Sequence, residues 1–262
     1  MAALTGITGA LTSWGSGSIH AQLAATGTQP ASFTLNLEGE DFDVTAFESA
    51  GVGQHIKGLQ GWSFDATAQL KVPDHGALGL VTYTAGYTTN LNAWTLDVQR
   101  AEFDVTAFAA TEKAYIPGKY DWGGSFAGFL DGTTALVAVN NGSEPATGTF
   151  KYQEKGGTDN TWSGSIFTTS ANVSVSPQAV NAVSYNFRGT GALTQSTPSA
   201  GAGVLPNGAI ALTAAETVVL TASSGRTYTG SAFWTMIGLN VGVGQATVLR
   251  MRGRGTGALT IA

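Results

Sequence analysis

A six-residue motif that occurs twice is the feature that most constrains the fold of this chain. Phe-Asp-Val-Thr-Ala-Phe lies at residues 42–47 and again at residues 103–108. The match extends upstream, because residues 33–37 align with residues 94–98 in the same frame. Self-similarity in a fixed frame indicates an internal structural repeat, which any fold of the chain must accommodate.

A second repeat fills the C-terminal half. Arg-Gly-Thr-Gly-Ala-Leu-Thr at 188–194 recurs at 254–260, and residues 162–167 align with residues 228–233 in the same frame. The chain therefore contains two copies of each half of one unit, in the order first half, first half, second half, second half. This order leaves open which first half pairs with which second half.

The repeats predict the domain organisation. We expect an N-terminal arm at 1–31, the first half of unit one at 32–88, unit two with both halves at 89–197, a linker at 198–208, and a second copy of the second half at 209–262 that completes unit one. The linker contains the Pro, Gly, Ser and Asn residues that favour turns.

Hydrophobic periodicity predicts that the units are built from strands. Phe33, Leu35 and Leu37 alternate with polar residues, which is the period of a half-buried strand. Loops are expected at 48–61 and 109–121, each followed by a strand, and short helices at 131–142 and 73–80. The predicted fold class is all-β, with two related β-sandwich or barrel units and one or two short helices.

The composition indicates a surface with few charged side chains. Only 11% of residues are charged while 43% are hydrophobic, and soluble surfaces usually carry more charge. Either the protein is a stable β protein covered by Thr, Ser and Asn, or copies of the chain cover one another, which we favour because long alternating strands leave edges to be paired. We expect no export signal and no membrane span.

The sequence offers little for catalysis or metal binding. There is no cysteine, and His20, His55 and His75 stand in unrelated contexts, so we expect no catalytic, cofactor or metal site. A net charge of −5 disfavours a dedicated nucleic-acid binder. We interpret Asp43 and Asp104 as turn residues whose side chains bond backbone N–H groups near the following threonine.

One charge pattern suggests a contact between subunits. Arg250, Arg252 and Arg254 alternate and so share one face of the final strand. A solvated strand face is the plain interpretation, and DNA binding is the weakest one because the chain is acidic. The functional interpretation is an intersubunit charge match with the acidic group of Glu38, Glu40 and Asp43.

The order of the motifs resembles the tail tube (major tail) proteins of tailed bacteriophages. The resemblance is carried by Phe-Asp-Val-Thr-Ala-Phe at 103–108, by residues 115–126 with their Pro-Gly and Trp-Gly-Gly-Ser, by Trp-Ser-Gly-Ser at 162–165, and by residues 185–193 with their Arg-Gly-Thr-Gly-Ala-Leu. The family has one such unit per chain and six chains per ring. Two units per chain therefore imply three chains in a pseudo-six-fold ring.

The resemblance also implies roles for particular residues and partners. The long loops after the Asp-Val-Thr motifs would contact the next ring, through Val44, Thr45, Phe47, Ile56 and Trp62 in the first copy and Val105, Thr106, Phe108, Ile116, Pro117 and Trp122 in the second. Other copies of the chain would be the main partners, together with other tail proteins such as the tape measure and terminator. DNA would pass without sequence-specific binding through a lumen that we expect to be net negative. The protein would reside in the virion tail, and in the host cytoplasm during assembly.

Rival functions remain from the sequence. A carbohydrate-binding or adhesive β-sandwich would need exposed Trp or Tyr side chains on a concave face. A glycosidase would need two carboxylates of the Glu38–Glu48 cluster across a cleft. Another phage tail ring or baseplate component of the same fold is a further alternative.

Overall fold

The fold is described here from a computed structural model. It describes residues 10–14, 31–45, 52–69, 81–83, 91–129, 144–153, 159–177, 179–196, 215–222, 226–242, 245 and 247–262. Every element in these residues is a β-strand. The strands are β1 (Ala10–Trp14), β2 (Ala31–Asp43), β3 (His55–Gln69), β4 (Val81–Tyr83), β5 (Leu91–Asp104), β6 (Tyr115–Phe129), β7 (Ala146–Gln153), β8 (Asp159–Ser174), β9 (Ala182–Ser196), β10 (Glu216–Thr221), β11 (Thr227–Gly242) and β12 (Val248–Ile261).

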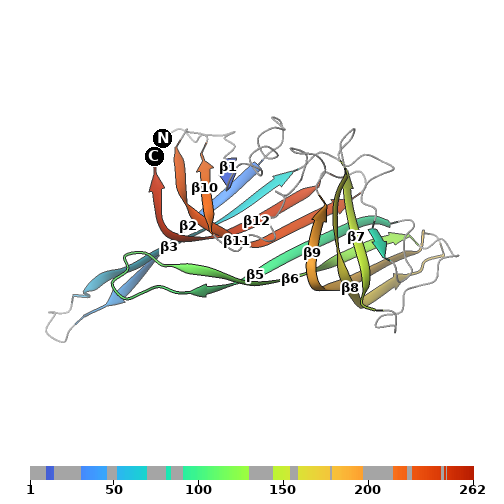
Figure 1. Cartoon of the computed structure of the whole chain (residues 1–262), viewed down its shortest axis with the longest axis horizontal. Helices are drawn as coiled ribbons and strands as arrows, with labels where there is room; N and C mark the ends of the chain where they lie inside the picture. Colours follow the sequence, from blue (N-terminus) through green and yellow to red (C-terminus); the bar gives the residue numbers. More distant parts are fainter. Residues whose placement is uncertain are drawn as a thin grey trace.

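The strands form one antiparallel sheet that combines both copies of the unit. Its order is β2-β3-β12-β11-β5-β6-β9-β8-β7-β4, with β10 beside β11 and β1 beside β10 (Figure 1). The β2–β3 hairpin therefore lies beside the β11–β12 hairpin, and the β5–β6 hairpin lies beside the β8–β9 hairpin. Each first half is thus paired with a second half, and β11 joins β5 between the two pairs.

Bulges bend the long strands of the second halves. In β11 the register with β12 shifts between Gly230 and Ser231 and again between Trp234 and Met236. β8 has two equivalent shifts against β9. Because a bulge bends and twists its strand, one part of each strand lies in the long central sheet and the other turns out of it, toward β10 at one end and β7 at the other (Figure 1).

The bends bring aromatic side chains over the central strands. Trp94 of β5 lies with its ring centroid 5.7 Å from that of Phe150 on β7 and 6.0 Å from that of Trp162 on β8. Phe150 also stacks on Phe187 of β9 at 4.8 Å. All four side chains are buried, so this face of the sheet supplies the core. The other face, called the open face below, carries the exposed residues Asp97, Gln99, Arg250 and Arg252.

The expected all-β fold is confirmed, and two local predictions need correction. Residues 55–61 and 115–121 were expected in loops, but they lie in β3 and β6, so the loops are much shorter. The predicted helices at 131–142 and 73–80 lie outside the described residues, as do the linker at 198–208 and nearly all of the N-terminal arm.

Candidate subunit interface

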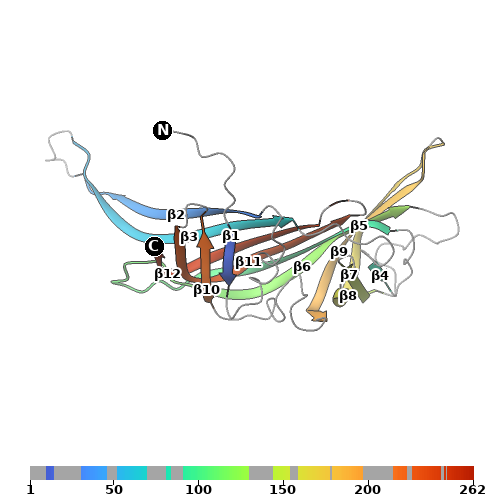
Figure 2. The ribbon, with the colours of Figure 1, turned by 90° about the horizontal axis from the view of Figure 1, so that it is seen from above.

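Two long β-arms project from the same end of the central sheet. Arm one (residues 39–45 and 52–58) is the far end of the β2–β3 hairpin, and arm two (residues 100–118) is the far end of the β5–β6 hairpin (Figure 2). Phe42 pairs with Ile56 in arm one, and Phe103 pairs with Ile116 in arm two. The same sequence repeat therefore builds the same structure twice.

A glycine in each arm lies directly under an aromatic ring. A Cβ atom added at Gly58 would lie 2.5 Å from the ring of Phe42, and one added at Gly118 would lie 2.7 Å from the ring of Phe103. A side chain at either position would have to displace the ring above it. The glycines, which suggest a loop in the sequence, thus permit close packing within a strand pair.

The Asp-Val-Thr motifs fix the ends of both arms. The backbone N–H of Thr45 donates to Asp43 Oδ1 at 2.8 Å, and that of Thr106 donates to Asp104 Oδ1 at 2.9 Å, which confirms the turn role expected for the two aspartates. In each case the threonine hydroxyl then accepts a backbone N–H from the residue that precedes the other strand, Gln54 or Ala114. Hydrogen bonding by the threonine side chain and backbone holds the pKa of both aspartates below the ordinary value.

Both arms expose apolar side chains at the positions assigned to ring stacking. The exposed ones among the predicted residues are Val44, Ile56, Val105, Phe108 and Ile116. Phe42, Val52 and Phe103 add to this apolar surface. Thr45 and Thr106 close the turns, Pro117 lies within β6 opposite Glu102, and Phe47 lies outside the described residues.

Trp62 and Trp122 do not belong with the stacking residues. Both side chains are buried, at 3% exposure, in the core. The Nε1–H of Trp62 donates to Gly257 O, and that of Trp122 donates to Gly191 O, each at 3.1 Å. The assignment of these tryptophans to a contact loop is therefore corrected: each joins the first half of a unit to its second half.

The arginines of β12 find acidic partners within the chain. Arg254 Nη1 lies 2.7 Å from Glu38 Oε1, and the Arg254 guanidinium carbon lies 4.1 Å from the centroid of the Tyr115 ring. Arg252 Nε lies 2.6 Å from Asp65 Oδ1. The Arg254–Glu38 pair therefore forms without a second subunit. Of the other groups in the proposed charge match, Glu40 pairs with Lys113 at 2.7 Å, Asp43 closes its turn, and Arg250 is exposed.

Arm two rests on unit one, a contact that the sequence did not reveal. The backbone N–H of Lys113 donates to Gln60 O at 2.8 Å, and that of Gly257 donates to Lys113 O at 3.1 Å. The N–H of Tyr115 donates to Thr256 Oγ1 at 3.1 Å. These bonds hold the turn of arm two against β3 and β12, the two strands beside the core of unit one.

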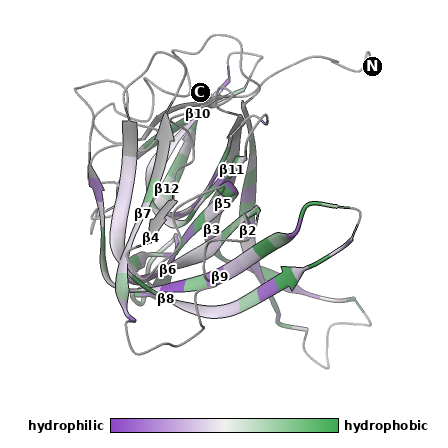
Figure 3. Ribbon diagram, turned by 90° about the vertical axis from the view of Figure 1, so that its right-hand side faces the viewer, coloured by the Kyte–Doolittle hydropathy of each residue, from purple (hydrophilic) through white to green (hydrophobic). Residues whose placement is uncertain are grey.

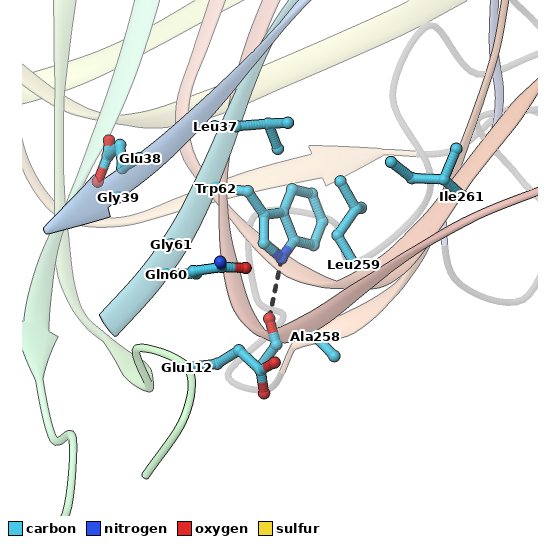
Figure 4. Close-up of a pocket in the computed structure, with 11 residues that line it drawn as sticks. Leu37, Glu38, Gly39, Gln60, Gly61, Trp62, Glu112, Ala258, Leu259 and Ile261 are labelled. Atoms are coloured by element: carbon cyan, nitrogen blue, oxygen red, sulfur yellow. Dashed lines mark hydrogen bonds between the residues drawn. The ribbon is translucent and has the colours of Figure 1, made fainter. Parts of the chain in front are cut away.

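A small hollow lies where arm two meets unit one. Leu37, Leu259 and Ile261 line one side, Glu112 of arm two lines the other, and the indole of Trp62 forms its floor (Figure 4). Leu37 and Ile261 are exposed. The mixture of exposed apolar groups with one carboxylate suits contact with protein better than binding of a defined small molecule.

The described residues contain no group of three or more His, Cys, Asp or Glu side chains placed to hold a metal ion. They also contain no helix that is both long and apolar enough to cross a membrane. The fold and the site define an all-β protein with a duplicated unit and two arms that expose apolar side chains, and among the described strands β2 pairs along one edge alone. Neither protein-family models nor curated proteins gave a match to the chain.

Proposed function

We propose that this chain is a structural subunit of a phage tail tube, assembling as rings that stack into a hollow tube for DNA. The observation that carries the proposal is the pair of equivalent arms, each presenting apolar side chains to solvent. Repeated apolar surfaces on one chain are typical of contacts with other copies. The order of the sequence motifs, which resembles the tail tube family, supplies the particular function.

The open face of the sheet suits a conduit for DNA. Arg252 is paired with Asp65, and Arg188 with Asp121. Burial raises the pKa of Asp97, and the nearby positive charge of Arg250 opposes that rise. A cation that is already paired with a carboxylate gains less by binding phosphate, so DNA would bind less tightly at Arg252 and Arg188 than at unpaired lysines and arginines.

The rival functions receive less support from the same structure. The side chains of Trp62, Trp94, Trp122, Trp162 and Trp234 are buried, so they form no aromatic platform for a sugar. In the acidic cluster, Glu38 pairs with Arg254 and Glu40 with Lys113, while Asp43 bonds Thr45. These carboxylates have structural roles, whereas a glycosidase needs a pair held across a cleft.

Negative-stain electron microscopy of the purified protein tests the proposal. We expect hollow rings and stacked tubes with a stain-filled centre. A field of small separate particles at all protein concentrations, accompanied by glycan binding, would instead favour the carbohydrate-binding alternative.

A further inference from the structure

The two units within one chain meet through one strand pair, and the sequence repeat suggests an equivalent strand pair between two chains. β11 pairs with β5 in antiparallel register from Met236 opposite Gln99 to Gly242 opposite Ala93. This internal seam buries three apolar residues from each strand, namely Ile237, Leu239 and Val241 with Val98, Leu96 and Trp94. The seam therefore forms part of the core.

Each strand of the internal seam has a repeat equivalent whose same edge is open. β5 corresponds to β2 in the frame of the first repeat, and β11 corresponds to β8 in the frame of the second. Among the described strands, β2 pairs only with β3. β7 pairs with β8 only as far as Ile166, and no other described strand lies along the remainder of that edge.

The open edges have the same residue pattern as the internal seam. The positions equivalent to its six core residues are again apolar, namely Ala171, Val173 and Val175 on β8 and the segment after it, and Leu37, Leu35 and Phe33 on β2. The alternate positions are polar, namely Ser170, Asn172 and Ser174 with Glu38, Asn36 and Thr34. A strand pair built from these edges would therefore continue both the apolar and the polar face of the sheet.

Exposure differs sharply between the internal seam and the open edges. Val241 and Val98 are each 1% exposed, whereas their equivalents Val175 and Leu37 are 71% and 63% exposed. β8 also stops earlier than β11, since its last residue, Ser174, corresponds to Asn240 rather than to Gly242. The β8–β9 hairpin projects from the body (Figure 3), and Val173, Val175 and Val180 at the end of the hairpin are exposed.

We infer that β8 of one copy pairs with β2 of a second copy and reproduces the internal seam between chains. The register follows from the internal one: Ala171 lies opposite Leu37, Val173 opposite Leu35, and Val175 opposite Phe33. This inference rests on the proposed self-assembly and specifies its interface. It makes the sheet continuous from chain to chain, which removes the exposed edges that favour uncontrolled aggregation.

The contact of arm two with unit one is also expected to have an equivalent between two chains. Arm one of the second copy lies on unit two of the first, as arm two lies on unit one within the chain. Gly53 takes the place of Lys113, and Tyr120 and Gly191 take the places of Gln60 and Gly257. Because the internal bonds use backbone groups here, they do not depend on the side chains that differ. Thr190 is the repeat equivalent of Thr256, and His55 is the equivalent of Tyr115. The Thr190 hydroxyl would therefore accept the backbone N–H of His55, as the Thr256 hydroxyl accepts that of Tyr115.

Disulfide cross-linking tests the register directly, because the chain has no native cysteine. The variant Asn36→Cys/Asn172→Cys places both thiols opposite each other on the polar face, where substitution leaves the core intact. The control Asn36→Cys/Ser176→Cys moves one thiol further along the strand, roughly 13 Å away, beyond the reach of a disulfide. Mixing the single variants Asn36→Cys and Asn172→Cys shows whether the bond joins two chains.

We expect covalent oligomers from the Asn36→Cys/Asn172→Cys variant, covalent dimers from the mixed single variants, and monomers from the control. Hollow rings that cross-link only in the control pairing, or in neither pairing, would overturn the register while leaving the proposed assembly standing. Single particles without cross-links in any variant would overturn both, provided that thermal unfolding shows each variant to be folded.

Discussion

The indole Nε1–H of Trp62 donates a hydrogen bond to the carbonyl oxygen of Gly257 at 3.1 Å, across the junction between the first and second halves of unit one. Trp122 and Gly191 repeat this bond at 3.1 Å in unit two. Gly257 and Gly191 also share a left-handed backbone, with φ of 74° and 75°. The two units therefore have the same joint, which gives the duplication a structural meaning beyond sequence identity.

Removing the indole N–H should weaken both joints similarly. Trp62→Phe and Trp122→Phe each leave a glycine carbonyl without its donor and lose part of a buried ring, so we expect each to lower the free energy of unfolding by about 1–3 kcal/mol. Trp94→Phe is the control, because the buried Nε1–H of Trp94 has no acceptor among the described residues. Denaturant titration measures all three, and a larger loss for Trp94→Phe would contradict the role of the bond.

The left-handed glycines should resist substitution for a backbone reason. An alanine Cβ at Gly191 or Gly257 would meet nothing within 4 Å, yet their positive φ should make Gly191→Ala and Gly257→Ala cost about 1–2 kcal/mol each. Gly39→Ala also meets nothing within 4 Å and lacks a positive φ, so its stability should stay within about 0.5 kcal/mol of the parent. Thermal unfolding distinguishes the two cases, and equal behaviour of all three would contradict this explanation.

Two other glycines should resist substitution because of close packing. A Cβ at Gly189 would lie 1.9 Å from the Trp122 ring, and one at Gly255 would lie 2.1 Å from the Trp62 ring. Gly189→Ala and Gly255→Ala must displace a core tryptophan, and overpacking of this kind costs about 1–3 kcal/mol or more. Near-ultraviolet circular dichroism should show a changed tryptophan environment in both variants. An unchanged spectrum together with unchanged stability would show that the core is looser than the structure indicates.

Arg254 and Arg188 are repeat equivalents with different surroundings. The Arg254 side chain is 14% exposed and contacts Glu38 and the Tyr115 ring, whereas that of Arg188 is 62% exposed beside Asp121. Arg254→Gln should therefore destabilise the protein by about 1–3 kcal/mol, while Arg188→Gln should change stability by less than about 1 kcal/mol. Denaturant titration compares the two, and equal losses would show that the partly buried position of Arg254 has no effect on its contribution.

The turns of the arms should loosen in acid. The pKa of Asp43 and Asp104 lies below the ordinary value of about 3.9 when the chain is folded. A lowered folded pKa means that each carboxylate stabilises its turn above about pH 4, and that this contribution is lost as pH falls through the folded pKa. Amide hydrogen exchange at Thr45 and Thr106, corrected for the intrinsic pH dependence, should show protection falling in that range. Asp104→Asn should lose this pH dependence at Thr106 only.

The sequence predicts the repeated parts of this fold better than the contacts between them. Alternating Phe33, Leu35 and Leu37 identify β2, and Asp43 identifies its turn, because both depend on neighbouring residues. Pro117 and Gly118 suggest a loop, yet they lie in β6, because a bulge between Arg100 and Glu102 and a ring above the glycine accommodate them. Local patterns do not contain this long-range information.

The same limit applies to the candidate interface. The exposed apolar residues of the arms, such as Ile56 and Ile116, could be named from the repeat. The burial of Trp62 and the docking of Lys113 against Gln60 could not, since both need the register between β3 and β12. The signal that was available is the repeat itself: once Trp62 is placed against Gly257, its equivalent Trp122 is predicted to lie against Gly191.

The most direct test of the account is the mass of the assembly in solution. A single chain has a mass of 26.7 kDa, and mass photometry across a range of concentrations should show species containing three chains and stacks of such species. A single population at the mass of one chain under all conditions, with both open edges unpaired, would contradict the central claim that copies of the chain complete one another.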